Sequence, residues 1–222
     1  MYQVIRCLFG TSDRRVKVGD DIQRLKKVKY PLDSICYTYG KDNHQYLIDN
    51  NIKSVLLCDE DMMFADDQYW AHKLYVWQVA SKTYDKFFYI DWDVLLMRPL
   101  PNTIGHLLKG KKFLASLRCY VNQKVTWRND HKRKVPCASF MYFTKNIADE
   151  LYNLWIDMGK PRKEELVLAK YTELDGKLDL DYYYNMYEPK DLFILKNHTP
   201  FKDVKGVNLD TYYRHFNGRI YE

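Results

Sequence analysis

Two aspartates stand one residue apart where an apolar run ends. Residues 87–90 are Phe-Phe-Tyr-Ile, Asp91 and Asp93 follow with Trp92 between them, and the chain turns apolar again from Val94. Removing two carboxylates from water is costly unless a positive charge lies between them, so a divalent cation is their natural partner. The first hypothesis from these residues is a metal-dependent enzyme.

The same spacing recurs elsewhere, so context has to separate a site from ordinary solvated acids. Asp59 and Asp61 also follow an apolar run, but further aspartates come soon after them, which is typical of an acidic loop. Asp91 and Asp93 are the stronger pair because the chain re-enters an apolar strand at once. The alternative for both pairs is a strand end with acids that bind nothing.

The end of the chain offers a third metal ligand. His215 stands between Arg214 and the residues Phe-Asn-Gly-Arg, which end at Gly218 and Arg219. Imidazole binds metals, glycine allows close backbone approach, and guanidinium groups bind phosphate oxygens. Two aspartates and one histidine favour Mn²⁺ or Mg²⁺ over a structural Zn²⁺. A histidine that only faces solvent is the alternative.

The elements that must position these residues follow from hydrophobic periodicity and turn residues. The expected strands are residues 2–8, 34–39, 54–58, 87–90, 94–97, 113–117, 138–143 and 193–195, and the expected helices are residues 45–50, 69–84, 145–158 and 181–187. Strands alternate with helices through the first half, which predicts an α/β fold with a mixed, mostly parallel sheet flanked by helices. In such sheets ligands bind at the carboxyl ends of the strands.

A basic segment lies between two of these strands and is predicted to be a loop. Its cations surround a single acid, Asp130, and are Arg118, Lys124, Arg128, Lys132, Arg133 and Lys134. A solvated loop, a lid over an acceptor or phosphate, and a nucleic-acid contact are the three interpretations.

Composition limits the remaining possibilities. The chain has 222 residues without a Pro/Gly/Ser-rich linker, which predicts one domain, and its 46% hydrophobic and 29% charged residues exclude disorder. Five widely spaced cysteines without a C-x-x-C pair favour reduced thiols and a cytoplasmic location. No apolar run approaches the roughly 20 residues that span a bilayer, so we expect no membrane segment.

Three stretches together resemble a known family. They are Tyr-Asp-Lys-Phe-Phe-Tyr-Ile-Asp-Trp-Asp-Val-Leu at residues 84–95, His-Lys-Leu-Tyr-Val-Trp at 72–77 and His-Phe-Asn-Gly at 215–218. The chain resembles the GT-A glycosyltransferases with a DxD motif, especially retaining enzymes of the glycogenin and galactosyltransferase type. The resemblance covers nearly the whole chain. It implies a single Rossmann-like GT-A domain over residues 1–222, with a nucleotide-binding half at 1–100 and an acceptor half with a metal- and diphosphate-binding tail at 101–222. The small size also resembles glycosyltransferase domains of large algal viruses, which would place the protein in the host cytoplasm.

The resemblance implies roles for the matching residues. Asp93 would bind Mn²⁺ (or Mg²⁺) directly, Asp91 would contact the metal and the ribose, and His215 would be the third protein ligand. Lys73 would reach the donor sugar or diphosphate. The remaining implied contacts are Leu8, Phe9, Gly10 and Thr11 for uracil and ribose, largely through the backbone, Gly218 and Arg219 for the diphosphate, and Asp179 or Asp181 beside the anomeric carbon.

Reaction chemistry fits this assignment. The leaving diphosphate gains charge as the glycosidic bond breaks, and a metal with Arg219 and Lys73 would stabilise that charge. The anomeric centre becomes oxocarbenium-like, so Asp179 or Asp181 could stabilise or attack it. Inversion stays open, because its base would be another acid.

The sequence therefore predicts a metal-dependent glycosyltransferase that moves a sugar from a UDP-sugar to a glycan or protein-linked acceptor, with retention of configuration and without a nucleic-acid partner. A nucleotidyltransferase is one alternative, although it would want a Gly-Ser phosphate turn and the chain contains no Gly-Ser dipeptide. A non-catalytic module that binds glycans or nucleic acid without metal is the other.

Overall fold

The structure is a computed structural model, and part of the chain is described in it. Described are residues 3–10, 15, 18–19, 22–23, 33–57, 70–92, 94–95, 113–121, 124–126, 133–174, 177–178, 183–185, 194–196 and 213–215. Beyond residue 93, side chains are described only at 138–139, 141–142 and 144–172.

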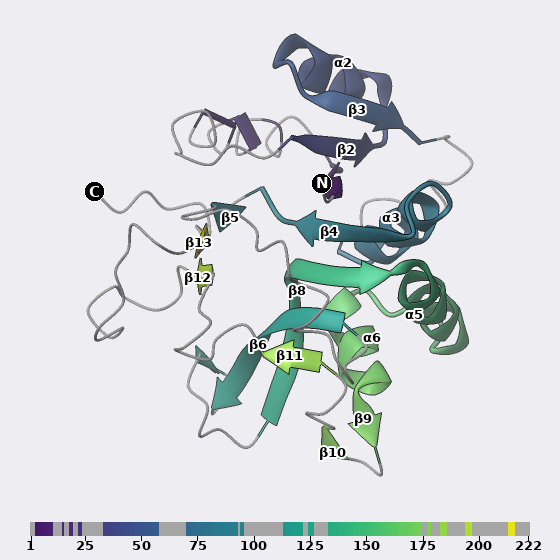
Figure 1. Cartoon of the computed structure of the whole chain (residues 1–222), viewed down its shortest axis with the longest axis vertical. Coiled ribbons are helices and arrows are strands. Elements are labelled where there is room, and N and C mark those ends of the chain that lie inside the picture. The colour runs from purple at the N-terminus through teal and green to yellow at the C-terminus, as the bar shows by residue number, and fades with distance from the viewer. Residues whose placement is uncertain are drawn as a thin grey trace.

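One mixed sheet forms the centre of the fold (Figure 1). Its strands are β1 (Gln3–Leu8), β2 (Ser34–Thr38), β3 (Lys53–Leu56), β4 (Lys86–Ile90), β6 (Phe113–Val121), β7 (Lys124–Thr126), β8 (Arg133–Thr144) and β11 (Tyr183–Asn185). They are ordered β11-β6-β8-β4-β1-β2-β3, with β7 paired to β6. The strands β3, β2, β1 and β4 run parallel, and β8 then pairs antiparallel with both β4 and β6. The predicted fold class, an α/β fold on a mixed, mostly parallel sheet, is confirmed.

Helices cover this sheet and supply much of the core. They are α2 (Lys41–Asp49), α3 (His72–Ser81), α5 (Lys145–Asp157) and α6 (Glu164–Tyr171). Helix α3 packs against α5, as Figure 1 shows, and α6 packs against α5 and β8. Leu74 and Trp77 of α3 and Trp155 of α5 are fully buried in one cluster with Phe87 and Tyr89 of β4. Since burying a side chain of this size contributes roughly 1.5–3 kcal/mol, these contacts fix α3 against the end of β4.

Two small sheets complete the described elements. Strands β9 (Glu173–Leu174) and β10 (Lys177–Leu178) form an antiparallel pair. The other sheet contains β5 (Val94–Leu95), β12 (Ile194–Lys196) and β13 (Tyr213–His215), in the order β12-β13-β5. The end of the chain is therefore joined to the segment that follows Asp93. In the part of the chain that the structure describes, no helix combines the length and the apolar character needed to cross a membrane.

Several sequence predictions about elements are confirmed, and others are wrong. Strands predicted at residues 2–8, 34–39 and 87–90 are β1, β2 and β4, and the helices predicted at 69–84 and 145–158 are α3 and α5. Thr144 occupies the N-cap position of α5 in an extended conformation, although its side chain makes no capping hydrogen bond. Helix α2 begins four residues before the predicted start, at Lys41. Helix α6 was not predicted.

The predicted helix at residues 181–187 is wrong, because Tyr183–Asn185 is strand β11. Its backbone pairs with Phe113–Ala115 at the edge of the sheet. Consecutive tyrosines favour a strand, and the free edge of β6 offers partners for their backbone groups.

The predicted basic loop is also wrong where it is described. Strand β6 continues to Val121, β7 pairs back onto it, and β8 begins at Arg133. The backbone of Cys119 pairs with Lys134 and that of Tyr120 with Arg133. Antiparallel ladders need only backbone groups, so a high density of cations does not prevent a strand whose side chains reach solvent.

Candidate active site

Asp91 lies at the carboxyl end of the parallel strands, as the position of ligands in this fold class predicts. It directly follows β4, and its backbone N–H donates to the carbonyl of Ser139 on β8 at 2.8 Å. Its side chain is 22% exposed. The carboxylate is therefore held at the sheet edge but keeps access to solvent.

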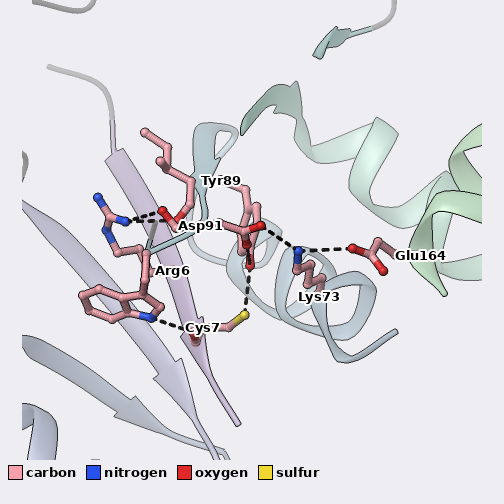
Figure 2. Close-up of polar contacts among 8 residues, drawn as sticks. Arg6, Cys7, Lys73, Tyr89, Asp91 and Glu164 are labelled. Carbon is pink, nitrogen blue, oxygen red and sulfur yellow. Dashed lines mark hydrogen bonds and ion pairs between the residues drawn. The ribbon is translucent and has the colours of Figure 1, made fainter. Parts of the chain in front are cut away.

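Each oxygen of the Asp91 carboxylate accepts one hydrogen bond (Figure 2). Oδ1 accepts from the hydroxyl of Tyr89 at 2.8 Å, and Oδ2 accepts from Nζ of Lys73 at 3.0 Å. Tyr89 comes from β4 itself and Lys73 from the first turn of α3. A carboxylate has about four lone-pair positions, so both oxygens retain capacity for a metal ion.

Lys73 bridges Asp91 to a second acid. Its ammonium lies 3.1 Å from Oε1 of Glu164 on α6, and the side chains of Lys73 and Glu164 are 12% and 6% exposed. Burial alone would lower the pKa of Lys73, but the carboxylates of Asp91 and Glu164 hold it well above its ordinary value. Burial raises the pKa of Glu164, and the charge of Lys73 opposes that rise. Lys73 is therefore a cation shared by two acids.

The phenol of Tyr89 stays protonated, because burial and the nearby charge of Asp91 raise its pKa well above the ordinary value. Its oxygen lies 2.9 Å from Sγ of Cys7. Since the Tyr89 hydroxyl donates to Asp91, the Cys7 thiol is the donor in this contact. Figure 2 shows the resulting chain from Cys7 through Tyr89, Asp91 and Lys73 to Glu164.

A buried arginine supports the turn from the neighbouring strand. Nη1 of Arg6 donates to the backbone carbonyl of Asp91 at 2.7 Å and, more weakly, to that of Ile90 at 3.4 Å. Its guanidinium also lies 5.0 Å from the centre of the Trp92 ring, and the indole N–H of Trp92 donates to the Cys7 carbonyl at 2.8 Å. These contacts fix the backbone on which Asp91 stands.

The predicted nucleotide segment lies at the same edge, after β1. Leu8 and Phe9 are buried, and Phe9 packs against Tyr39 and His72 with ring centroids 5.1 and 4.8 Å apart. Gly10 has φ 95°, a left-handed conformation that glycine adopts without strain. Because the side chains are turned inward, a ligand here would meet mainly backbone.

The remaining predicted residues are placed only in part. The backbone of His215 in β13 pairs with Val94, the residue after Asp93, so the chain end is adjacent to the Asp-x-Asp turn. The side chain of His215 is not described. Outside the described residues lie Asp93, Thr11, Asp179, Asp181, Gly218 and Arg219, together with Asp59 and Asp61.

Sequence reasoning missed Arg6, Cys7, Tyr89 and Glu164. Arg6 left a signal, since it is a lone charge in the otherwise apolar run from Val4 to Leu8. Tyr89 and Cys7 are ordinary strand residues by type. Glu164 gave none, because it belongs to a helix that was not predicted and is distant in sequence from its partners.

Comparison with known proteins identifies the fold. Neither a protein-family model nor a curated protein sequence matches the chain. The structure is similar to that of the WbbM bifunctional glycosyltransferase, with a TM-score of 0.55 and 11% identity, over 98% of this chain and 46% of that chain. It is also similar to a glycosyltransferase involved in the glycosylation of the major capsid of PBCV-1, with a TM-score of 0.53 and 10% identity, over 98% of this chain and 94% of that chain. The chain thus spans less than half the length of the first protein and most of the second. At these identities the likeness establishes the fold, a Rossmann-like α/β domain of the GT-A kind.

Proposed function

We propose that this chain is a metal-dependent glycosyltransferase that moves a sugar from a UDP-sugar to a glycan or protein-linked acceptor, with retention of configuration. One observation carries the proposal. The partly exposed carboxylate of Asp91 stands at the carboxyl end of β4, beside the buried ammonium of Lys73, in a fold that two glycosyltransferases share.

The residues fit a hard divalent cation, Mn²⁺ or Mg²⁺. Asp91 offers oxygen ligands at an edge that solvent reaches, and the register of β5 with β13 brings the backbone of His215 next to the residue that follows Asp93. Asp91, Asp93 and His215 would hold the ion, a donor set rich in oxygen with one nitrogen. The ion would supply charge that stabilises the leaving diphosphate.

The nucleotide would bind along the same edge. The backbone from Leu8 to Thr11 would contact uracil and ribose, which is consistent with the buried side chains of Leu8 and Phe9. Lys73, Gly218 and Arg219 would hold the donor sugar and diphosphate, because ammonium and guanidinium groups bind phosphate oxygens strongly.

Asp179 or Asp181 would act at the anomeric carbon. These residues lie between β10 and β11, and β11 extends the same sheet that carries Asp91. A carboxylate placed there would stabilise an oxocarbenium-like centre or form a bond with it, as retaining transfer requires.

Thermal unfolding with ligands tests the proposal. UDP should raise the melting temperature when Mn²⁺ or Mg²⁺ is present and not in chelator, because the carboxylates and the diphosphate repel each other without the cation. A panel of UDP-sugars with Mn²⁺, analysed for released UDP, would then identify the donor. Equal stabilisation by UDP in chelator would rule out the metal-bridged site.

A further inference from the structure

Glu164 brings a second acid to the ammonium that already pairs with Asp91. Nζ of Lys73 lies 3.0 Å from Oδ2 of Asp91 and 3.1 Å from Oε1 of Glu164. The two acids differ in environment, since the Asp91 side chain is 22% exposed and that of Glu164 is 6% exposed. One acid can therefore receive a ligand from solvent, whereas the other faces the interior (Figure 2).

A divalent cation on Asp91 would change this arrangement. The cation and the Lys73 ammonium carry charge of the same sign and would compete for one carboxylate, and like charges a few ångströms apart repel strongly in a partly buried site. With Asp91 as its sole acidic partner, Lys73 would oppose the incoming ion. Glu164 offers the ammonium a second anionic partner that the ion does not approach.

We propose that Glu164 is a positioning residue, which retains the Lys73 ammonium beside Asp91 when a divalent cation takes the Asp91 carboxylate. This inference rests on the proposed metal-dependent function. It means that the cation and the ammonium occupy the site together, so that two positive groups face a bound diphosphate. Glu164 touches neither ligand and acts through Lys73.

The position of Glu164 in the fold extends the donor site into the second half of the chain. Glu164 is the first residue of α6, which packs against α5 and β8. Lys73 and Asp91 come from α3 and the end of β4. A charge on α6 therefore sets the position of a group in the nucleotide-binding half.

Manganese affinity, measured without nucleotide or activity, tests the role of Glu164. Mn²⁺ is titrated into the whole protein, and free ion is followed by electron paramagnetic resonance. Glu164→Gln keeps an oxygen near Lys73 but removes the charge, so Lys73 should hold Asp91 more tightly and Mn²⁺ should bind roughly fivefold more weakly. Glu165→Gln, the same change one residue along the helix, is the matched control and should leave the affinity within about twofold of the wild type.

A double-mutant comparison separates positioning from plain charge loss. In a Lys73→Met background, adding Glu164→Gln should change the Mn²⁺ affinity by less than about twofold, because the ammonium through which Glu164 acts is gone. A long-range effect of the Glu164 charge would persist in that background, and this result would overturn the proposal. An unchanged affinity for Glu164→Gln alone would overturn it as well.

Folding and the proposed function are controlled separately. Circular dichroism checks each variant. If Glu164→Gln unfolds, Glu164→Asp, whose shorter side chain draws back from Lys73, takes its place and should weaken Mn²⁺ binding in the same direction, and wild-type affinity in that variant would overturn the proposal. If the wild type itself binds no Mn²⁺, the proposed function fails with this inference, whereas wild-type binding that is insensitive to Glu164 overturns this inference alone.

Discussion

Asp91 combines restraint with availability. Tyr89 and Lys73 each donate to one of its oxygens, and Arg6 holds its backbone carbonyl, yet 22% of the side chain remains exposed. Hydrogen bonds and a nearby cation stabilise the charged form of a carboxylate. The residue is therefore held as an anion in a fixed orientation before any ligand arrives.

Loss of charge at the Asp-x-Asp pair should remove activity while the fold persists. Asp93→Asn retains shape but supplies no charge to a cation, so we expect transfer of sugar from the identified UDP-sugar to fall by roughly 100-fold or more. Released UDP measures activity, and circular dichroism verifies the fold. Asp59→Asn is the matched control and should be mild, and a comparable loss there would show that the other acidic pair binds the metal.

The hydroxyl of Tyr89 should contribute measurably to stability. Tyr89→Phe removes the donor to Asp91 and the acceptor for the Cys7 thiol, so the free energy of unfolding should fall by about 1 kcal/mol. Urea denaturation measures this change. Tyr37→Phe removes a buried hydroxyl two strands away and provides the comparison for metal affinity, which should weaken only in Tyr89→Phe. Identical metal affinity in both variants would contradict a role for Tyr89 in orienting Asp91.

At the scale of elements, three segments distant in sequence form the site. The end of β4 supplies Asp91, the first turn of α3 supplies Lys73, and α6 supplies Glu164. Strand β1 supports them from beneath through Arg6. The core cluster that contains Trp77, Tyr89 and Trp155 joins these elements, so their packing determines the distances among the charged groups.

These origins explain what the sequence could and could not predict. Strands β1, β2 and β4 were predictable because short apolar runs end on polar or glycine residues, and Asp91 stood out because an acid at a buried strand end has few structural explanations. Strand β11 and the extension of β6 were missed because their pairing depends on partners far along the chain. Glu164 was missed for the same reason, since its significance comes from Lys73, 91 residues earlier in the sequence.

Strand β13 gives a prediction at this scale. It pairs antiparallel with β5, the segment that follows Asp93, and it carries His215 opposite Val94. Metal bound through Asp93 and His215 would lock this pair, because opening it would then require loss of a ligand. Hydrogen exchange of residues 213–215 should therefore slow when UDP and Mn²⁺ are added together, whereas β2 should be unaffected. Exchange that is the same with and without ligands would make β13 a purely structural strand and remove His215 from the proposed metal site.

At the scale of the whole molecule, the interior holds acidic groups in their neutral form. Cys36 and Tyr37 lie on the central strand β2 and are buried. Burial raises the pKa of Cys36 well above its ordinary value, with a further contribution from Cys7, and burial together with Tyr84 raises the pKa of Tyr37 to about 12. In the unfolded chain these groups would ionise at about pH 8.5 and 10.

This difference predicts a loss of stability in alkali. Between the ordinary and the raised pKa, the unfolded chain has released the proton and the folded chain has not, so the free energy of unfolding falls as pH rises. The decline should begin near pH 8.5 and continue to about pH 12, with Tyr37 contributing roughly 2–3 kcal/mol by the end of that range. Urea denaturation between pH 8 and pH 11, with tyrosine ionisation followed by absorbance, measures it. Tyr37→Phe should flatten the profile above about pH 10, because that variant has no phenol to ionise at this position. A profile with the same slope in the variant and the wild type would show that burial of Tyr37 does not determine the alkaline limit of the fold.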